Sequence, residues 1–402
     1  MFRSLPLLAL SAAAVFRNAG AQASSTPSLL TETESHALLT LHRQLVEIES
    51  ISQNEGNVSD WLTSYLRSKD WTVEQQHVSP NRTNVFAYSS KSKRHTSILV
   101  SSHIDTVPPY WPYYYDEEKD VIGGRGSVDA KGSVAAQIIA AEGLREGLID
   151  DISLLFVVGE EQGGDGMRLF SSWEDRPGDY EIVVFGEPTE AKLVCGHKGI
   201  VGFNIKVTGR AAHSGYPWLG VSANDVLLEA LGKLLILRDT GGLPWSRKYG
   251  NSTMNFGKIV GGVAGNVVAE AAEASVTVRI AAGDPDVIKR LVYGAVADVK
   301  KKAEELGAKI EFDWTVAGGY GPVDIDCDID GFEKFTVNYG TDVPHLHGVE
   351  KRYLFGPGSI FVAHSDHEAL KRKELEQAVL DYRRLIIAAT RVDHQEAERI
   401  EM

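Results

Sequence analysis

Three short apolar runs, each ending in histidine or carboxylate side chains, place the strongest constraint on how this chain can fold. They span residues 98–100, 152–158 and 182–185. Continuous apolar runs of this length, bounded by glycine or polar residues and with a helical pattern between two of them, predict strands of a parallel sheet that is buried on both faces. Ligands of such sheets collect outside the carboxyl ends of the strands, so the residues that follow these runs are expected to meet there.

The side chains that follow the runs are of the types that bind metal ions. They are His103 and Asp105 after the first run, Glu160 and Glu161 after the second, and Glu187 after the third. Positions two apart on a strand face the same side, and a metal-bound imidazole commonly donates its second N–H to a carboxylate, so Asp105 could orient His103. Adjacent residues leaving a strand project differently, so one glutamate can bind metal while the other stays free as a general base. Each motif taken singly is more often an ordinary surface feature.

Two further segments offer candidates of the same kind. A glycine-rich turn over residues 123–132 contains Asp129 and leads into an alanine-rich helical pattern. The turn lacks the spacing of a phosphate-binding loop and does not directly follow an apolar strand, so an aspartate that points both oxygens at two metal ions is the better interpretation. Near the C-terminus, the apolar run 360–363 predicts another short strand that ends at His364.

Chain length and element order predict two domains. A chain of 402 residues is long for one core. Between residues 200 and 315 the patterns follow the order strand, helix, strand, strand, helix, strand, which is typical of a ferredoxin-like unit. Strong strand and helix patterns resume after it. We therefore expect an α/β fold in which a largely parallel-sheet main domain, residues 24–199 and 316–402, carries an inserted α+β lid domain, residues 200–315.

Residues 1–23 have the pattern of a secretory signal peptide. A basic start, an apolar stretch over residues 5–15 and small residues at the cleavage point make up this pattern. The stretch is too short to span a bilayer, and the alternative interpretation is an amphipathic N-terminal segment. Secretion agrees with three sequons for glycosylation, at Asn57, Asn81 and Asn251. We therefore expect a secreted, extracellular glycoprotein without a membrane partner.

Charge and cysteine content exclude some classes of protein. A formal net charge of -14 argues against a nucleic-acid partner, which would select a basic face. The chain has only 2 cysteines, Cys195 and Cys327, so no disulfide framework holds it together. In an oxidising compartment they could form one bridge or stay free, and the sequence leaves both alternatives open.

Taken in order, these motifs resemble those of a known family. The chain resembles the M20 metallopeptidases, which include acetylornithine deacetylase, succinyl-diaminopimelate desuccinylase, aminoacylase-1 and the glutamate carboxypeptidases, and most of all the secreted fungal members described as probable carboxypeptidases. The resemblance runs over nearly the whole mature chain. The segments that carry it, in the order of the family, are 103–108, 124–132, 159–166, 186–189 and 356–368.

The resemblance implies a pair of zinc ions per subunit. It assigns His103 and Glu187 to one zinc, Glu161 and His364 to the other, and Asp129 to a bridge between them. His367 lies near the last ligand, and the spacing to Glu368 favours His364. The donor types agree with this assignment, because mixed imidazole and carboxylate ligands suit zinc, cobalt or manganese better than calcium or copper.

The resemblance also implies roles for side chains that do not bind metal. Glu160 would be the general base, and Asp105 would orient the first histidine. His213 matches the lid histidine that helps to stabilise the transition state, often from the partner subunit of a homodimer. Asn266 and Arg279 lie where members of the family hold the carboxylate of the substrate.

These expectations combine into a predicted function. We expect a metallocarboxypeptidase that cleaves an amide bond next to a free carboxylate, with small peptides as substrates. The nearest alternative is a deacylase of N-acyl amino acids, which would use the same metals and base. A third alternative, from another class, is a secreted metal-binding homologue without activity, but such a protein would have no reason to keep the free carboxylate of Glu160 beside a metal ligand.

Overall fold

The computed structural model describes most of the 402-residue chain. It covers residues 30–89, 94–145, 147, 149–314 and 319–400. The predicted signal peptide, residues 1–23, lies outside the described residues. Within the described part, no helix is both long enough and apolar enough to cross a membrane.

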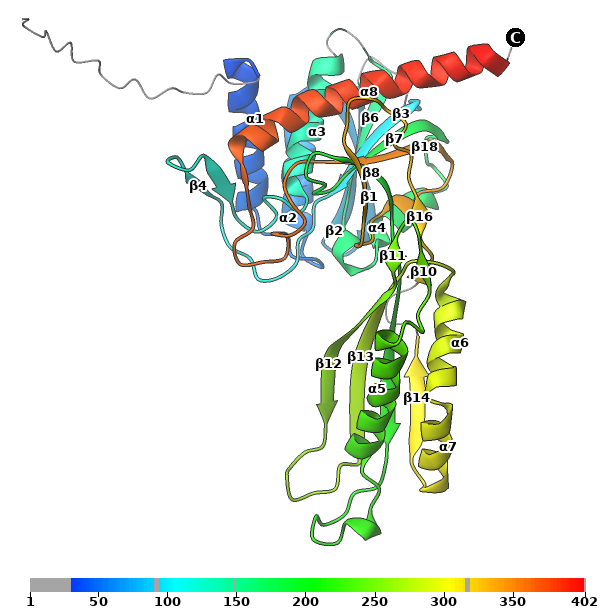
Figure 1. Ribbon diagram of the computed structural model, residues 1–402. Coiled ribbons are helices and arrows are strands. Elements are labelled where there is room, and N and C mark those ends of the chain that lie inside the picture. The colour runs from blue at the N-terminus through cyan, green and yellow to red at the C-terminus, as the bar shows by residue number, and fades with distance from the viewer. Residues whose placement is uncertain (1–29, 90–93, 146, 148, 315–318, 401–402) are drawn as a thin grey trace, which may run out of the picture.

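A six-stranded sheet forms the centre of the main domain (Figure 1). In spatial order its strands are β1 (Trp71–Ser79), β2 (Arg82–Ser89), β6 (Ile152–Val157), β3 (Ile98–His103), β7 (Tyr180–Gly186) and β18 (Val349–Phe355). The last four are parallel to one another, whereas β1 and β2 pair antiparallel at one edge. The three apolar runs are β3, β6 and β7, and the prediction of a largely parallel sheet is confirmed.

Helices cover one face of this sheet. They are α1 (Glu32–Glu47), α2 (Gly56–Ser68), α3 (Lys131–Arg145) and α8 (Arg372–Ile400). Thr31 begins α1 with a capping box, because its Oγ1 accepts the Glu34 N–H while the Glu34 carboxylate accepts the Thr31 N–H, both at 3.2 Å. The alanine-rich α3 is buried along almost its whole length between the sheet and its neighbours α1 and α8, which requires small side chains.

Shorter elements cover the other face and the edges. They are α4 (Asp165–Ser171), the 3-10 turns η1 (Glu160–Gln162) and η3 (Val343–His345), the sheet of β4 (Tyr114–Asp116), β5 (Val121–Gly123) and β19 (Ala369–Lys371), and the sheet of β8 (Leu193–His197), β16 (Val323–Asp324) and β17 (Lys334–Val337). A second core, which includes Phe86, Leu155 and Phe170, lies between these elements and the sheet. The central strands are thus buried on both faces, as their apolar sequences require.

The lid domain has the predicted ferredoxin-like order. Its elements are β9 (Gly199–Thr208), η2 (Pro217–Leu219), α5 (Ala223–Asp239), β10 (Trp245–Ser246), β11 (Gly250–Asn251), β12 (Thr253–Gly261), β13 (Ala271–Ile280), α6 (Pro285–Ala295), α7 (Ala297–Glu305), β14 (Lys309–Asp313) and β15 (Gly319–Tyr320). The antiparallel sheet has the order β12-β13-β9-β14, and α5, α6 and α7 pack on one face of it (Figure 1). The second helix of the predicted order, which begins after Asp284, is divided at Val296 into α6 and α7. The exact domain boundaries stay predictions.

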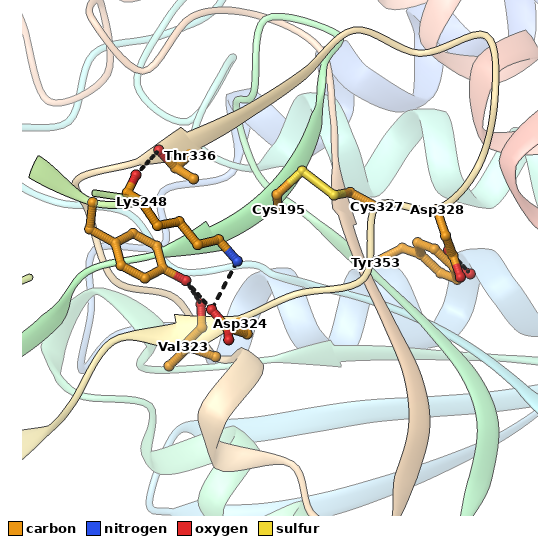
Figure 2. Close-up of a disulfide and its surroundings, with 9 residues drawn as sticks. Cys195, Lys248, Val323, Asp324, Cys327, Asp328, Thr336 and Tyr353 are labelled. Carbon is orange, nitrogen blue, oxygen red and sulfur yellow. Dashed lines mark hydrogen bonds and ion pairs between the residues drawn. A yellow bond between two sulfur atoms is a disulfide. The ribbon is translucent and has the colours of Figure 1, made fainter. Parts of the chain in front are cut away.

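A disulfide joins Cys195 and Cys327 (Figure 2). Of the two alternatives that the sequence left open, a bridge or free thiols, the structure has the bridge. Cys195 lies in β8, shortly before the chain enters the lid at β9, and Cys327 follows β16, after the chain has returned. The neighbouring Asp328 accepts a hydrogen bond from Tyr353 of the central sheet at 2.9 Å. The two connections of the lid are therefore joined to each other and to the main domain.

The prediction of a strand over residues 360–363 is wrong. This segment forms turns, and the side chain of Phe361 is 83% exposed. The strand of this region is β18, which ends at Phe355. The Gly-Pro-Gly sequence that follows cannot continue the sheet, so the apolar run after it has no strand to pair with. His364 therefore lies in a loop, with a left-handed φ of 61° that is costly for a residue with a side chain.

Candidate metal centre

Two clusters of potential metal ligands share one aspartate. One contains His103, Asp129 and Glu187, and the other contains Asp129, Glu161 and His364. In each cluster one donor atom per residue lies within 4.8 Å of the others. The Oδ1 atom of Asp129 is 3.1 Å from His103 Nε2, and its Oδ2 atom is 3.2 Å from His364 Nε2. The two oxygens of Asp129 thus face different histidines, which is the arrangement of a bridging carboxylate.

The remaining ligand candidates complete this geometry. Glu187 Oε2 is 3.8 Å from His103 Nε2, and Glu161 Oε2 is 3.0 Å from His364 Nε2. His103 ends β3, Glu161 follows β6 and Glu187 follows β7. Because these strands are parallel, their carboxyl ends meet at one edge of the sheet, and the cluster lies where the apolar runs predicted it.

The charges of the cluster fit a pair of divalent cations. Burial raises the pKa of Glu161 to about 7, and the nearby carboxylate of Asp129 adds to this rise. Burial also raises the pKa of Glu187. Carboxylates in these positions therefore resist ionisation unless positive charge lies between them. Imidazole and carboxylate donors suit zinc, cobalt or manganese, so the residues present fit the ions that the sequence implied.

Asp105 acts on both sides of the cluster. Its backbone carbonyl, rather than its carboxylate, lies at hydrogen-bond distance from His103 Nδ1, at 3.0 Å, whereas Oδ1 is 3.5 Å away. The carboxylate accepts the backbone N–H groups of Glu160 at 3.1 Å and Glu161 at 3.3 Å, and the hydroxyl of Ser52 at 2.7 Å. Asp105 thus fixes the histidine through its backbone and the glutamate turn through its side chain. No pattern in the sequence marked Ser52.

Glu160 begins the turn η1 and belongs to neither ligand cluster. Burial raises the pKa of its carboxyl group well above the usual value, and the carboxylate of Glu187 raises it further. A raised pKa makes a carboxylate a stronger base. Gly159 and Gly164 flank the turn with φ of 75° and 78°, a conformation that favours glycine and lets the chain fold back sharply.

A cleft of about 560 Å³ lies over the ligand cluster. The lid contributes Arg279 and Tyr320 to its lining, and the role of Arg279 toward a substrate carboxylate stays a prediction. The main domain contributes Arg168, Asp342 and His345, among others. No pattern in the sequence marked these three as residues of the site, because their place at the cleft arises from contacts between segments far apart in the chain, such as Arg168 with His345.

The polar sequence around His345 predicts a surface residue, and this prediction is wrong. Its side chain is buried, its Nε2 lies 3.2 Å from Arg168 Nη2, and its ring lies edge-on to that of Tyr320. The turn η3, in which it lies, packs against α4 below the cleft. His345 therefore supports the wall of the cleft between the two domains.

His213 and Asn266 lie away from this cleft. Their loops follow β9 and precede β13, at the end of the lid sheet opposite the main domain (Figure 1). The strand β9 spans about 30 Å, at about 3.3 Å per residue. The two residues are neighbours, since Ser214 N–H donates to the Asn266 carbonyl at 3.1 Å, and both side chains are exposed. Within a single chain, therefore, neither residue lies near the ligand cluster.

The three asparagines of the sequons lie on the surface. Asn57 is in the first turn of α2, Asn81 in the turn between β1 and β2, and Asn251 in β11, and all three side chains are exposed. Their exposure is compatible with glycosylation, which stays a prediction.

Comparison with known proteins identifies the family. The Peptidase dimerisation domain of the M20 peptidases matches residues 195–304. A probable carboxypeptidase of Aspergillus flavus is 49% identical over 379 residues, covering 87% of each chain. One of Emericella nidulans is 50% identical over 377 residues, covering 87% of this chain and 89% of its own. The chain belongs to the M20 peptidase family.

Solved structures of the M20 fold are similar over most of the chain. A tripeptidase of Staphylococcus aureus has a TM-score of 0.70 at 21% identity, covering 89% of this chain and 99% of its own. An M20 family metallo-carboxypeptidase of Sulfolobus solfataricus has a TM-score of 0.67 at 15% identity, covering 88% and 99%. These likenesses show the fold, a main domain with an inserted lid.

Zinc should stabilise this M20 protein, and Asp129 should be required for the effect. A ligand that binds only the folded state stabilises it, by about 2.7 kcal/mol at roughly 100 times its Kd. Calorimetry of metal-stripped protein with and without zinc measures the gain in Tm. Asp129→Ala should abolish the gain, because it removes a donor from both clusters. Asp366→Ala, at an aspartate whose side chain is 93% exposed, should retain it. A full gain in Asp129→Ala would contradict the shared site.

Proposed function

We propose that this M20 peptidase is a secreted carboxypeptidase with two zinc ions, which hydrolyses the amide bond next to the free carboxylate of a peptide. One observation carries the proposal: a buried Asp129 faces two histidines with its two oxygens, and Glu160, which is in neither ligand cluster, lines the same cleft next to the ligand Glu161 in the chain. His103 and Glu187 would hold one ion, Glu161 and His364 the other.

Glu160 would move the proton in this reaction. Bound zinc supplies a Lewis acid for the amide carbonyl and lowers the pKa of water to about 7. The carboxylate of Glu160 would accept the proton of the attacking water and later donate it to the nitrogen of the leaving amine. The backbone N–H groups of Glu160 and Glu161 donate to the carboxylate of Asp105, and these bonds hold the base beside the ligand.

Arg279 would select substrates with a free carboxylate. It extends from β13 into the cleft that the ligand cluster also lines. A guanidinium can hold a carboxylate through two parallel hydrogen bonds, and partial burial strengthens such bonds. The scissile amide would then lie between Arg279 and the ligand cluster, which places the cleavage at the C-terminal residue.

Peptides are favoured over N-acyl amino acids as substrates. The relatives in Aspergillus flavus and Emericella nidulans are described as probable carboxypeptidases. The predicted signal peptide and sequons support secretion, and extracellular peptides are natural substrates of a secreted enzyme. A deacylase of N-acyl amino acids would need the same ligands and base, so rates on a panel of both substrate classes separate the two functions.

We further propose a homodimer formed through the lid. The strand β12 is an edge of the lid sheet and exposes Ile259 and Val260, and α5 beside it exposes Leu228 and Ile236. Exposed apolar edges of this kind mark association surfaces. In a dimer, the loops at the far end of one lid could reach the cleft of the partner. Nδ1 of His213 accepts the Gly215 N–H at 3.0 Å, which leaves Nε2 as a donor for a developing oxyanion.

Loss of the base should separate metal binding from catalysis. Glu160→Gln should bind as much zinc as the wild type, because Glu160 is in neither cluster, while kcat falls at least about 100-fold. Metal analysis and peptide hydrolysis measure the two effects. Glu174→Gln, at an exposed glutamate, is the control and should retain full activity. Wild-type kcat in Glu160→Gln would rule out this mechanism.

Loss of Arg279 should weaken the recognition of the terminal carboxylate. Arg279→Gln should lower kcat/KM on peptides by about 10- to 100-fold, as expected for one charge-assisted contact. Peptide amides provide the control, because they lack the carboxylate and should be hydrolysed equally by both proteins. An equal loss on peptides and peptide amides would mean that Arg279 does not contact the carboxylate.

Mixed dimers test whether His213 acts in the partner's cleft. Glu160→Gln and His213→Ala proteins should each be nearly inactive. After exchange of subunits at equal amounts, roughly a quarter of the clefts should combine a wild-type Glu160 with a wild-type His213 from the partner, and that share of the activity should return. If the mixture stays inactive while light scattering shows mixed dimers, His213 does not act across the interface.

A further inference from the structure

The glycine-rich turn that carries Asp129 encloses an acidic side chain from the other end of the chain. One carboxylate oxygen of Glu368, Oε1, accepts the backbone N–H groups of Gly126 at 3.0 Å, Val128 at 3.1 Å and Asp129 at 3.1 Å. Backbone N–H groups of one turn that converge on an anion in this way form an anion-binding nest. The turn therefore does bind an anion, but the anion belongs to the protein.

The second oxygen of the same carboxylate is also held. Arg125 Nη1 donates to Glu368 Oε2 at 2.6 Å, and both side chains are 1% exposed. The guanidinium stacks at 4.2 Å on the ring of Trp111, and its Nε donates to the Pro109 carbonyl at 3.2 Å. The carboxylate of Glu368 is thus neutralised and fixed in a solvent-free position, where charge-assisted hydrogen bonds are strong.

This arrangement connects two segments of the ligand cluster. Glu368 follows His364 by four residues in the same loop, and it lies 239 residues from Asp129 in sequence. Its bond to the Asp129 N–H fixes the backbone from which the shared carboxylate projects. Any movement of the turn would displace both oxygens of Asp129 from the two histidines.

We propose that Glu368 is a positioning residue that sets the carboxylate of Asp129 between the two metal ions by holding its turn through three backbone N–H groups. This inference rests on the proposed dinuclear centre. The opposing view is that the buried pair of Glu368 and Arg125 only joins two loops. In that case its loss would lower the Tm and leave metal binding by the folded protein unchanged.

The chain offers a matched control for burial. Glu376, in α8, is also 1% exposed and accepts a hydrogen bond from the hydroxyl of Ser35 at 2.6 Å. Glu376 bonds to neither the turn of Asp129 nor the loop of His364. Glu376→Gln therefore removes a buried negative charge without touching the ligand segments.

The experiment titrates metal-stripped protein with cobalt(II), whose visible absorption depends on the coordination geometry. Glu368→Gln keeps an acceptor oxygen but loses the charge, and Glu368→Ala loses both. We expect cobalt(II) affinity to fall about 10-fold in Glu368→Gln and about 100-fold in Glu368→Ala, the range known for groups that orient metal ligands. The visible spectrum should change, and kcat at saturating metal should fall with KM nearly unchanged. Glu376→Gln should keep the affinity, spectrum and kcat of the wild type.

The outcomes separate this inference from the proposed function. The positioning role would be overturned if Glu368→Gln keeps the cobalt(II) affinity and kcat of the Glu376→Gln control within about twofold and shows the same visible spectrum. If Glu368→Ala does not fold, Glu368→Gln alone decides. If the wild-type protein binds no cobalt(II), the dinuclear centre itself fails, whatever the variants do.

Discussion

The rest of the structure depends on one cluster, in which buried carboxylates converge on two imidazoles. Such a cluster is unfavourable without cations, because burial disfavours the ionised form of each acid, and it is favourable with them. The shared Asp129 makes the two halves of the cluster one unit. The sheet supplies three ligands from the ends of parallel strands, and loops supply the other two. The positions of the two loop ligands must therefore be set by the groups that hold the loops.

Two acidic side chains that bind no metal hold the ligand-bearing turns in position. Asp105 holds the turn of the two glutamates, and Glu368 holds the turn of Asp129. Both act on backbone N–H groups rather than on the ligands' side chains. A backbone anchor leaves the donor atoms free for a metal ion while it removes the freedom of the loop, which is the supporting role expected of groups around a metal site.

The sequence predicted the parts of this structure that have a pattern. The ends of β3, β6 and β7 were predictable because an apolar run that stops on polar residues marks a buried strand, and the lid was predictable from the order of its elements. The apolar run before His364 marked it as a candidate, but the strand predicted there does not exist, so only the resemblance gave a valid ground for this ligand. Ser52, His345 and Glu368 act through contacts between distant segments, and no local periodicity records such contacts.

The disulfide gives the lid a property that its fold alone would not. Cys195 and Cys327 are 132 residues apart, and the whole lid sheet lies between them. A single proteolytic cut at any lid loop would yield two polypeptides that remain linked through sulfur. Both pieces would stay anchored on the same main domain, each contributing strands to one sheet. Under oxidising conditions, the disulfide thus closes the lid segment into a covalent ring, and a single cut within the ring opens it without detaching either part of the lid from the protein.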